Sequence, residues 1–206
     1  MIVEFTKQGQ INRGTRRGDT LIQLLSDPSI KRVLESGTFN GQGTTRLVYE
    51  ELKDREDAYF LSLETVDWLY EESKELYKNV PWIDIQRKTL VGPEDIRFDE
   101  SLKKFLQAQT GWTDEDLKHA IEEEKENASN CDRLDISKCQ YDLCILDGGE
   151  FFGWTEFAKV EKNTRYVYLD DIFVNKNHIT YNYCKEEYEE IVSGREGNGF
   201  AIFKLR

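Results

Sequence analysis

The sequence predicts an α/β fold, in which the strands of a sheet alternate with helices. Short apolar segments alternate along the chain with segments of helical periodicity. A glycine-rich turn at residues 194–199 separates two apolar C-terminal segments, 188–192 and 200–205, which is the pattern of a β-hairpin. With 206 residues, the chain fits a single domain, 1–206.

The first half of the chain contains three predicted strands with helices between them. Asp19 is a capping-type residue at the start of a predicted helix, 19–25. A strand is expected at 31–35, and the segment 45–52 that follows it has its apolar residues on one side of a helix. A second strand at 58–63, a helix at 67–78 and an alternating third strand at 82–86 follow.

In the second half, residues 141–146 form a nearly continuous apolar run. Such a run is typical of a central parallel strand that is covered on both faces. A short helix is expected at 153–162 and another strand at 165–169. The three prolines, Pro28, Pro81 and Pro93, all lie between predicted elements.

Two parts of the chain stand apart from this alternation. Residues 1–29 form an N-terminal arm, and residues from about 99 to 130 form a charged helical insertion. Two helices are expected in the insertion, broken near Thr110-Gly111, the second starting at the capping sequence Thr113-Asp-Glu-Asp. The insertion fits either a solvated helical excursion or a lid over an active site.

The composition excludes several classes of partner. Lys and Arg number 28 against 40 Asp and Glu, a net charge of −12, which disfavours nucleic acid and anionic membrane surfaces. No apolar run is long enough to span a bilayer, and the N-terminus has no apolar signal core, so a cytoplasmic protein is expected. The four cysteines show no CxxC spacing that would indicate a zinc knuckle.

Carboxylates follow the apolar strands at the positions where open α/β sheets bind ligands. They are Glu35, Glu64, Asp147 and the pair Asp170-Asp171. Glu35 opens a glycine-rich turn, residues 35–44, whose glycines permit sharp turning and close approach to a ligand. Its spacing matches neither a dinucleotide fingerprint nor a P-loop, and a tight strand-to-helix connection is the alternative. Glu64 is placed to accept hydrogen bonds from ribose hydroxyls, or is an exposed strand-end acid.

These motifs resemble class I S-adenosylmethionine-dependent methyltransferases over residues 30–206. The segments ESGTFNGQGT, LDGGEFFGW, YLDDI and GREGNGFAIFKL are most similar to the small O-methyltransferase branch, which contains catechol, cephalosporin and macrolide-sugar methyltransferases. The resemblance implies a Rossmann-like, seven-stranded, mostly parallel sheet with an antiparallel C-terminal hairpin. It further implies that Glu35 and Gly37 lie by the methionine part of the cofactor, that Glu64 holds the ribose, and that residues 90–95 are near the adenine. The expected cofactor-binding residues are Glu35, Gly37, Thr38, Phe39, Asn40, Gly41, Glu64 and Asp147.

In the metal-dependent members of this family, acids after the fourth and fifth strands bind a divalent cation. Those positions match Asp147, Asp170 and Asp171. Three carboxylates without a neighbouring His or Cys favour a hard ion such as Mg²⁺. The alternative is that Asp147 caps a helix and that the acidic pair forms a turn.

The expected catalytic residues are Glu150 and Asp147. Glu150 stands where relatives carry a Lys or His as proton acceptor, so it is a candidate base, a fourth metal ligand or a substrate contact. The aromatic residues Phe151, Phe152 and Trp154 fit either an acceptor pocket or core packing. His178 is more simply a surface residue than a substrate contact.

The expected activity is methyl transfer from S-adenosylmethionine to a hydroxyl group of a small molecule or sugar. Two alternatives stay open: a non-catalytic, cofactor-binding partner subunit, and another nucleotide-dependent enzyme such as a dehydrogenase, against which the glycine spacing argues. The sequence is also compatible with a homodimer.

Overall fold

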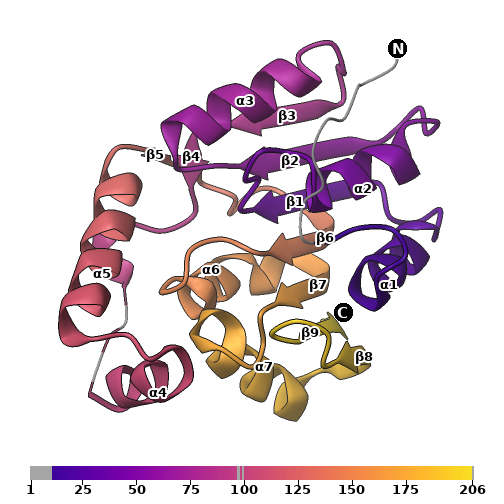
Figure 1. Cartoon of the computed structure of the whole chain (residues 1–206). Helices are drawn as coiled ribbons and strands as arrows, with labels where there is room; N and C mark the ends of the chain where they lie inside the picture. Colours follow the sequence, from indigo (N-terminus) through magenta and orange to yellow (C-terminus); the bar gives the residue numbers. More distant parts are fainter. Residues whose placement is uncertain (1–10, 97, 99, 206) are drawn as a thin grey trace.

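The computed structural model describes residues 11–96, 98 and 100–205 (Figure 1). Its main sheet has seven strands in the order β3-β2-β1-β6-β7-β9-β8. Their bounds are β1 (Arg32–Ser36), β2 (Tyr59–Leu63), β3 (Ile83–Gln86), β6 (Tyr141–Leu146), β7 (Thr164–Asp170), β8 (Glu189–Gly194) and β9 (Phe200–Lys204). The first five pair in parallel, whereas β9 runs antiparallel to both β7 and β8, so the predicted fold class is confirmed.

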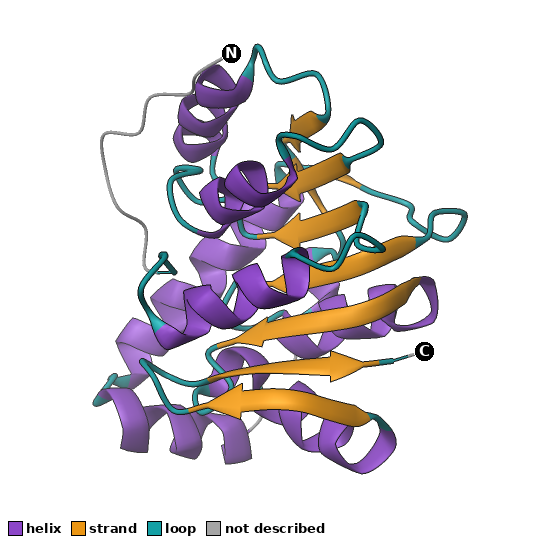
Figure 2. Cartoon of the chain, turned by 90° about the vertical axis from the view of Figure 1, so that its right-hand side faces the viewer, coloured by secondary structure: helices purple, strands orange, loops and turns teal. Residues whose placement is uncertain are grey.

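Helices cover both faces of this sheet (Figure 2). They are α1 (Arg16–Leu25), α2 (Thr44–Leu52), α3 (Asp67–Tyr77), α4 (Glu100–Thr110), α5 (Asp114–Ser129), α6 (Gly153–Val160) and α7 (Asn175–Glu187), with single 3₁₀ turns η1 (Pro93–Asp95) and η2 (Glu161–Asn163). A second, two-stranded sheet joins β4 (Lys88–Thr89) to β5 (Asp132–Arg133) on either side of the insertion. Across the described ranges, each helix is too short or too polar to cross a membrane.

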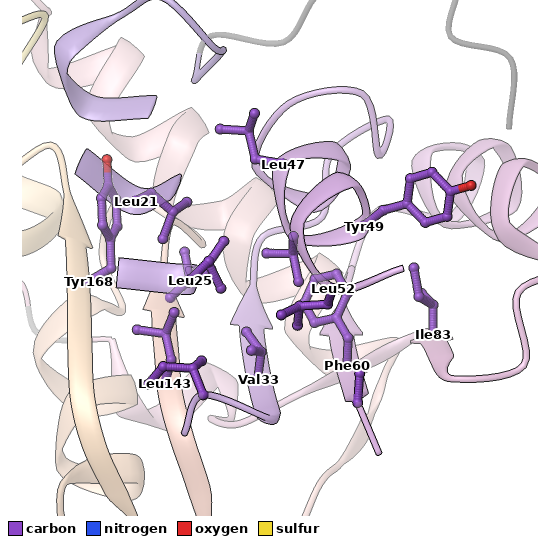
Figure 3. Packing of buried hydrophobic residues seen from close by; sticks show 14 of the residues in the cluster. Leu21, Leu25, Val33, Leu47, Tyr49, Leu52, Phe60, Ile83, Leu143 and Tyr168 are labelled. Carbon is purple, nitrogen blue, oxygen red and sulfur yellow. The ribbon is translucent and has the colours of Figure 1, made fainter. Parts of the chain in front are cut away.

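The side chains of β6 are buried on both faces of the sheet, as the apolar run at 141–146 predicts. Leu143 and Ile145 belong to the cluster under α1, α2 and α3, part of which is drawn in Figure 3. Cys144 and Leu146 belong to the cluster on the opposite face, with residues of α6 and α7. Complete burial of one such leucine contributes about 1.5–3 kcal/mol, so the central strand is fixed from both sides.

The N-terminal arm also contributes to this core within its described part. Leu21 and Leu25 of α1 are fully buried in the first cluster. The helix begins earlier than predicted, at Arg16, because Thr15 rather than Asp19 is its cap: the Thr15 hydroxyl accepts the N–H of Gly18. The Asp19 carboxylate instead accepts the N–H of Gly14 (2.8 Å) and closes the turn before the helix.

Helix α7 was not predicted, and its composition explains why. Its sequence has no apolar stripe, and three of its four buried residues are polar, namely Asn175, Asn177 and Thr180. The amide of Asn177 donates to the carbonyls of Leu146 (3.0 Å) and Asp170 (2.7 Å), which ties α7 to the ends of β6 and β7. This helix is therefore positioned by buried hydrogen bonds, which hydrophobic periodicity does not reveal.

Candidate active site

A cavity of about 490 Å³ lies at the carboxyl ends of the parallel strands. The loops after β1, β2, β6 and β7 form its walls, together with helix α5 of the insertion. Five of the eight predicted cofactor residues line it, namely Gly37, Thr38, Phe39, Glu64 and Asp147. The predicted base Glu150 and the acid Asp171 line it as well, so residues far apart in sequence meet in one cavity.

The glycine-rich turn after β1 packs tightly against the loop after β6. Gly37 has φ +93°, and its N–H donates to the carbonyl of Leu63 (3.0 Å). A Cβ atom at Gly37 would lie only 2.2 Å from the carbonyl oxygen of Asp147. Glycine is therefore required here twice, by its left-handed backbone and by the close approach of a second backbone.

Glu64 connects this turn to the start of α3. Its carboxylate accepts three backbone N–H groups, from Phe39 (2.7 Å), Thr65 (2.8 Å) and Val66 (2.9 Å). Burial raises the pKa of Glu64 overall, although these three hydrogen bonds act in the opposite direction. A carboxylate offers about four lone-pair sites, so one acceptor position remains for a hydroxyl in the cavity.

Three predicted cofactor residues, Glu35, Asn40 and Gly41, lie behind the cavity wall and are not part of its lining. Glu35 is fully buried, and its carboxylate accepts the hydroxyls of Thr45 (2.7 Å) and Ser62 (2.5 Å). Burial raises its pKa to about 8. The Gly41 carbonyl accepts the Tyr77 hydroxyl (2.6 Å), and the Asn40 amide oxygen accepts the N–H of Gln42 (3.1 Å). In this structure these groups hold the turn together from within.

The segment expected near the adenine is also displaced from the cavity. Leu90 and Val91 are buried in the core cluster of the opposite face, and none of residues 90–95 lines the cavity. Lys88 and Thr89, in the short strand directly before that segment, do line it.

Asp147, Asp170 and Asp171 converge as predicted, with carboxylate oxygens within 4.8 Å of one another. A lysine that the sequence analysis did not single out lies among them. Lys176 Nζ is 2.9 Å from Asp147 Oδ1 and 3.1 Å from Asp171 Oδ2. Arg17 of α1 lies 3.5 Å from Asp170 Oδ1. Three acids therefore face two cations.

The electrostatics of this cluster follow from its burial. Burial, together with the charges of Asp147 and Asp171, raises the pKa of Asp170 to about 7. Burial alone would lower the pKa of Lys176, but Asp147 and Asp171 outweigh it and raise that pKa. Three carboxylates alone suit a hard divalent ion. In this arrangement, however, two of the required oxygens already contact an ammonium group, so the set as it stands does not fit the ion.

Glu150 lines the cavity beside this cluster. Burial raises the pKa of Glu150, and so does the negative charge of Asp171, whereas the positive charge of Lys176 lowers it. The carbonyl oxygen of Glu150 accepts the Asn175 amide (2.7 Å), so its backbone is fixed by α7. Of the neighbouring aromatic residues, Phe152 lines the cavity, whereas Phe151 packs against the insertion and Trp154 against Tyr183.

Helix α5 closes one side of the cavity with Ala120, Glu123, Glu124 and Asn127. The Glu124 carboxylate accepts the backbone N–H groups of Glu150 and Phe151, the latter at 3.1 Å. Burial raises the pKa of Glu124 to about 7. These contacts support the lid interpretation of the insertion. Glu124 follows Leu117 and Ala120 at helical spacing, so its place on the inner face was readable from the sequence.

A second buried acid, Glu156 of α6, was also missed. The Ser36 hydroxyl donates to Glu156 Oε1 (2.5 Å), and burial raises the pKa of Glu156 to about 7. His178, by contrast, stacks on Phe105 of α4 with ring centroids 5.0 Å apart and does not line the cavity.

Replacing Glu124 with alanine is expected to release the loop after β6. Two backbone N–H groups lose their acceptor, at a cost of about 1–3 kcal/mol for the buried polar groups left unpaired. Hydrogen exchange should then accelerate at the amides of Glu150 and Phe151, while β6 keeps its protection. Glu126→Ala, an exposed change on the same helix, is the control, and equal protection in both variants would contradict the docking role.

The sequence matches no protein-family model and no curated protein. Solved structures with a similar fold are methyltransferases. A candidate caffeoyl-CoA O-methyltransferase from Staphylococcus aureus superposes with a TM-score of 0.55 and 13% identity, covering 95% of this chain and 86% of that one.

Two further structures are similar. An SAH-bound methyltransferase from Podospora anserina has a TM-score of 0.54 and 14% identity, with 93% and 80% of the two chains covered. A methyltransferase from Geobacter sulfurreducens has a TM-score of 0.55 and 9% identity, with the same coverages of 93% and 80%. The chain therefore has the Rossmann-like fold of the class I methyltransferases.

Proposed function

We propose that the protein binds S-adenosylmethionine and methylates a hydroxyl group of a small molecule or sugar. The observation that carries the proposal is that the turn at Gly37–Phe39, the acid Glu64 and the acids after β6 and β7 line one cavity of a methyltransferase fold. The fit to the cofactor rests on Glu64, whose carboxylate retains an acceptor position at the cavity wall for a ribose hydroxyl.

When bound, S-adenosylmethionine supplies an electrophilic methyl group. Gly37, Thr38 and Glu64 would hold it at the ends of β1 and β2. Glu150 is the proposed general base, because it lines the cavity and its burial raises its pKa above the ordinary value of a glutamate, which makes it a stronger proton acceptor. Asp147 orients the site through its ion pair with Lys176. Helix α5 forms one side of the cavity, which limits the space for an acceptor and favours a small one.

The test is methyl transfer from S-adenosylmethionine to a panel of small acceptors bearing catechol, sugar and amine groups, read as formation of S-adenosylhomocysteine by mass spectrometry. A hydroxyl acceptor should be turned over. Glu150→Gln should reduce that turnover by about 10²–10⁴-fold, the usual share of a general base. Glu123→Gln changes another acid that lines the cavity and is the matched control.

Binding of the cofactor without transfer to any acceptor would favour a non-catalytic partner subunit. Transfer to amines alone would overturn the hydroxyl assignment. Equal turnover by wild type and Glu150→Gln would remove Glu150 from the role of base.

A further inference from the structure

The charges on the cavity wall are strongly unequal. Within the described residues, its lining contains two cations, Lys88 and Lys176. Against these stand seven acids, Glu64, Glu123, Glu124, Asp147, Glu150, Glu156 and Asp171. Lys88 lies on the short strand after β3, whereas Lys176 lies among the acids after β6 and β7. Of the two, Lys176 is therefore the cation that contacts the acidic cluster.

The position of Lys176 is fixed by its neighbours on α7. Asn175 and Asn177, on either side, donate their amides to the carbonyls of Glu150 (2.7 Å) and of Leu146 and Asp170 (3.0 and 2.7 Å). The backbone of Lys176 also packs against the start of α6, since a Cβ at Gly153 would lie 1.8 Å from the Lys176 carbonyl oxygen. The backbone of Lys176 is thus held by the fold, and its side chain is 12% exposed.

Its contacts are those that a divalent ion would need. Lys176 Nζ lies 2.9 Å from Asp147 Oδ1 and 3.1 Å from Asp171 Oδ2. A Mg²⁺ ion would need these same oxygens as ligands at about 2.1 Å, and the positive Nζ that already contacts both of them would repel it. Arg17, 3.5 Å from Asp170 Oδ1, supplies a second positive charge to the same cluster.

We propose that Lys176 is the built-in cation of the acceptor site: its ammonium takes the place of a divalent metal among Asp147, Asp170 and Asp171 and orients the acceptor oxygen. The role of Lys176 toward the acceptor oxygen rests on the proposed methyltransferase function. Its occupation of the acidic cluster does not.

The chemistry follows from the donor capacity of an ammonium group, which has three N–H bonds. Within the described residues, Nζ donates one hydrogen bond, to Asp147 Oδ1, and forms an ion pair with Asp171 Oδ2. A further N–H can donate to the acceptor oxygen. As the new oxygen–carbon bond forms, the hydroxyl proton passes to Glu150 and the electron pair of the breaking sulfur–carbon bond stays on sulfur. Lys176 keeps its protons and stabilises the negative charge that develops on oxygen.

The first experiment measures Mn²⁺ binding by electron paramagnetic resonance in wild type, Lys176→Met and Lys176→Arg. Wild type and Lys176→Arg should bind no Mn²⁺ at the cluster, because a fixed cation fills it. Lys176→Met leaves three carboxylates without that charge and should gain one Mn²⁺ site, which the further change Asp171→Asn should remove again. Lys88→Met, which removes the other cavity lysine, should gain none.

The second measurement is catalytic. Methyl transfer by wild type should not change when EDTA is added. Lys176→Met should lower the turnover number by about 10²–10³-fold, the cost of one oxyanion donor, with the affinity for S-adenosylhomocysteine retained. Lys176→Arg keeps the positive charge and should recover part of the turnover number that Lys176→Met loses. A role limited to filling space would not predict this recovery.

Stoichiometric Mn²⁺ binding by wild type that Asp170→Asn abolishes would overturn the proposal. Failure of Lys176→Met to gain Mn²⁺ while remaining folded would also overturn it. If Lys176→Met does not fold, Mn²⁺ binding and EDTA sensitivity of wild type and Lys176→Arg still decide. Failure of the proposed methyltransferase function would be seen separately, as absence of transfer, because Mn²⁺ binding does not depend on turnover.

Discussion

Gly37→Ala is expected to destabilise the protein by about 2–5 kcal/mol and to abolish binding of S-adenosylhomocysteine. Non-glycine residues pay about 1–2 kcal/mol in the left-handed region, and Gly37 has φ +93°. The added Cβ would also lie 2.2 Å from the Asp147 carbonyl oxygen, and overpacking of this kind costs about 1–3 kcal/mol more. Urea unfolding and calorimetric titration measure the two effects.

The chain provides a matched control for the backbone part of this effect. Gly14 has φ +87°, and a Cβ there would meet no atom within 4 Å. Gly14→Ala should therefore cost only the left-handed strain and leave cofactor binding intact. Equal losses of stability in the two variants would contradict the role of the contact between the loops after β1 and β6. Gly37→Val should be worse than Gly37→Ala, because its branched side chain meets the same backbone.

Glu35→Gln is expected to remove a large part of the pH dependence of stability. Burial raises the pKa of Glu35 from its ordinary 4.5 to about 8. Between these values the folded protein binds a proton that the unfolded chain releases, so the free energy of unfolding falls as pH rises from 4.5 to about 8 and is level above. The full difference is about 5 kcal/mol by the linkage relation.

The test is urea unfolding of wild type and Glu35→Gln at mildly acidic and at alkaline pH. Glutamine resembles the protonated acid, so the two proteins should be similar in acid, and the variant should be more stable in alkali. Glu124, Glu156 and Asp170, with pKa values raised to about 7, keep some slope in both proteins. Glu186→Gln, on the exposed side of α7, should behave as wild type. Parallel pH profiles for wild type and Glu35→Gln would show that Glu35 is not buried as an acid.

The sheet could be predicted from local patterns of apolar residues. The run at 141–146 must be covered on both faces because it offers no polar side to water, and β6 is covered in this way. The same periodicity places Asp147 and Asp170 at the carboxyl ends of adjacent strands. Their convergence within 4.8 Å follows from parallel pairing, without any knowledge of the rest of the chain.

The direction of individual side chains could not be predicted in the same way. Glu35 and Glu64 both end apolar strands, yet Glu35 is the fourth residue of β1 and points into the layer occupied by Thr45. Glu64 follows the last residue of β2 and lies at the cavity. Glu35 pairs in register with Ser62, so Glu64 lies two positions nearer the carboxyl ends of the strands, and this difference in depth decides which acid lines the cavity. Sequence patterns do not fix strand ends so closely.

The position of Lys176 could not be predicted from the sequence, for a different reason. Its helix is held by the amides of Asn175 and Asn177, which donate to the carbonyls of Glu150 and Leu146, 25 and 31 residues earlier in the chain, and to the nearer carbonyl of Asp170. Such long-range hydrogen bonds leave no periodic trace. The alternative of a magnesium ion at Asp147, Asp170 and Asp171 stays a prediction that the Mn²⁺ experiment decides.

Calorimetric titration with S-adenosylhomocysteine is the most direct test that the cavity is a cofactor site. Wild type should bind one molecule per chain, and Glu64→Ala should bind it more weakly by about 1–3 kcal/mol, the loss expected for hydrogen bonds to a charged group. Because Glu64 also accepts three backbone N–H groups, circular dichroism of the Glu64→Ala variant checks that its fold is intact. No binding by wild type, or equal affinity in a folded Glu64→Ala variant, would contradict the assignment.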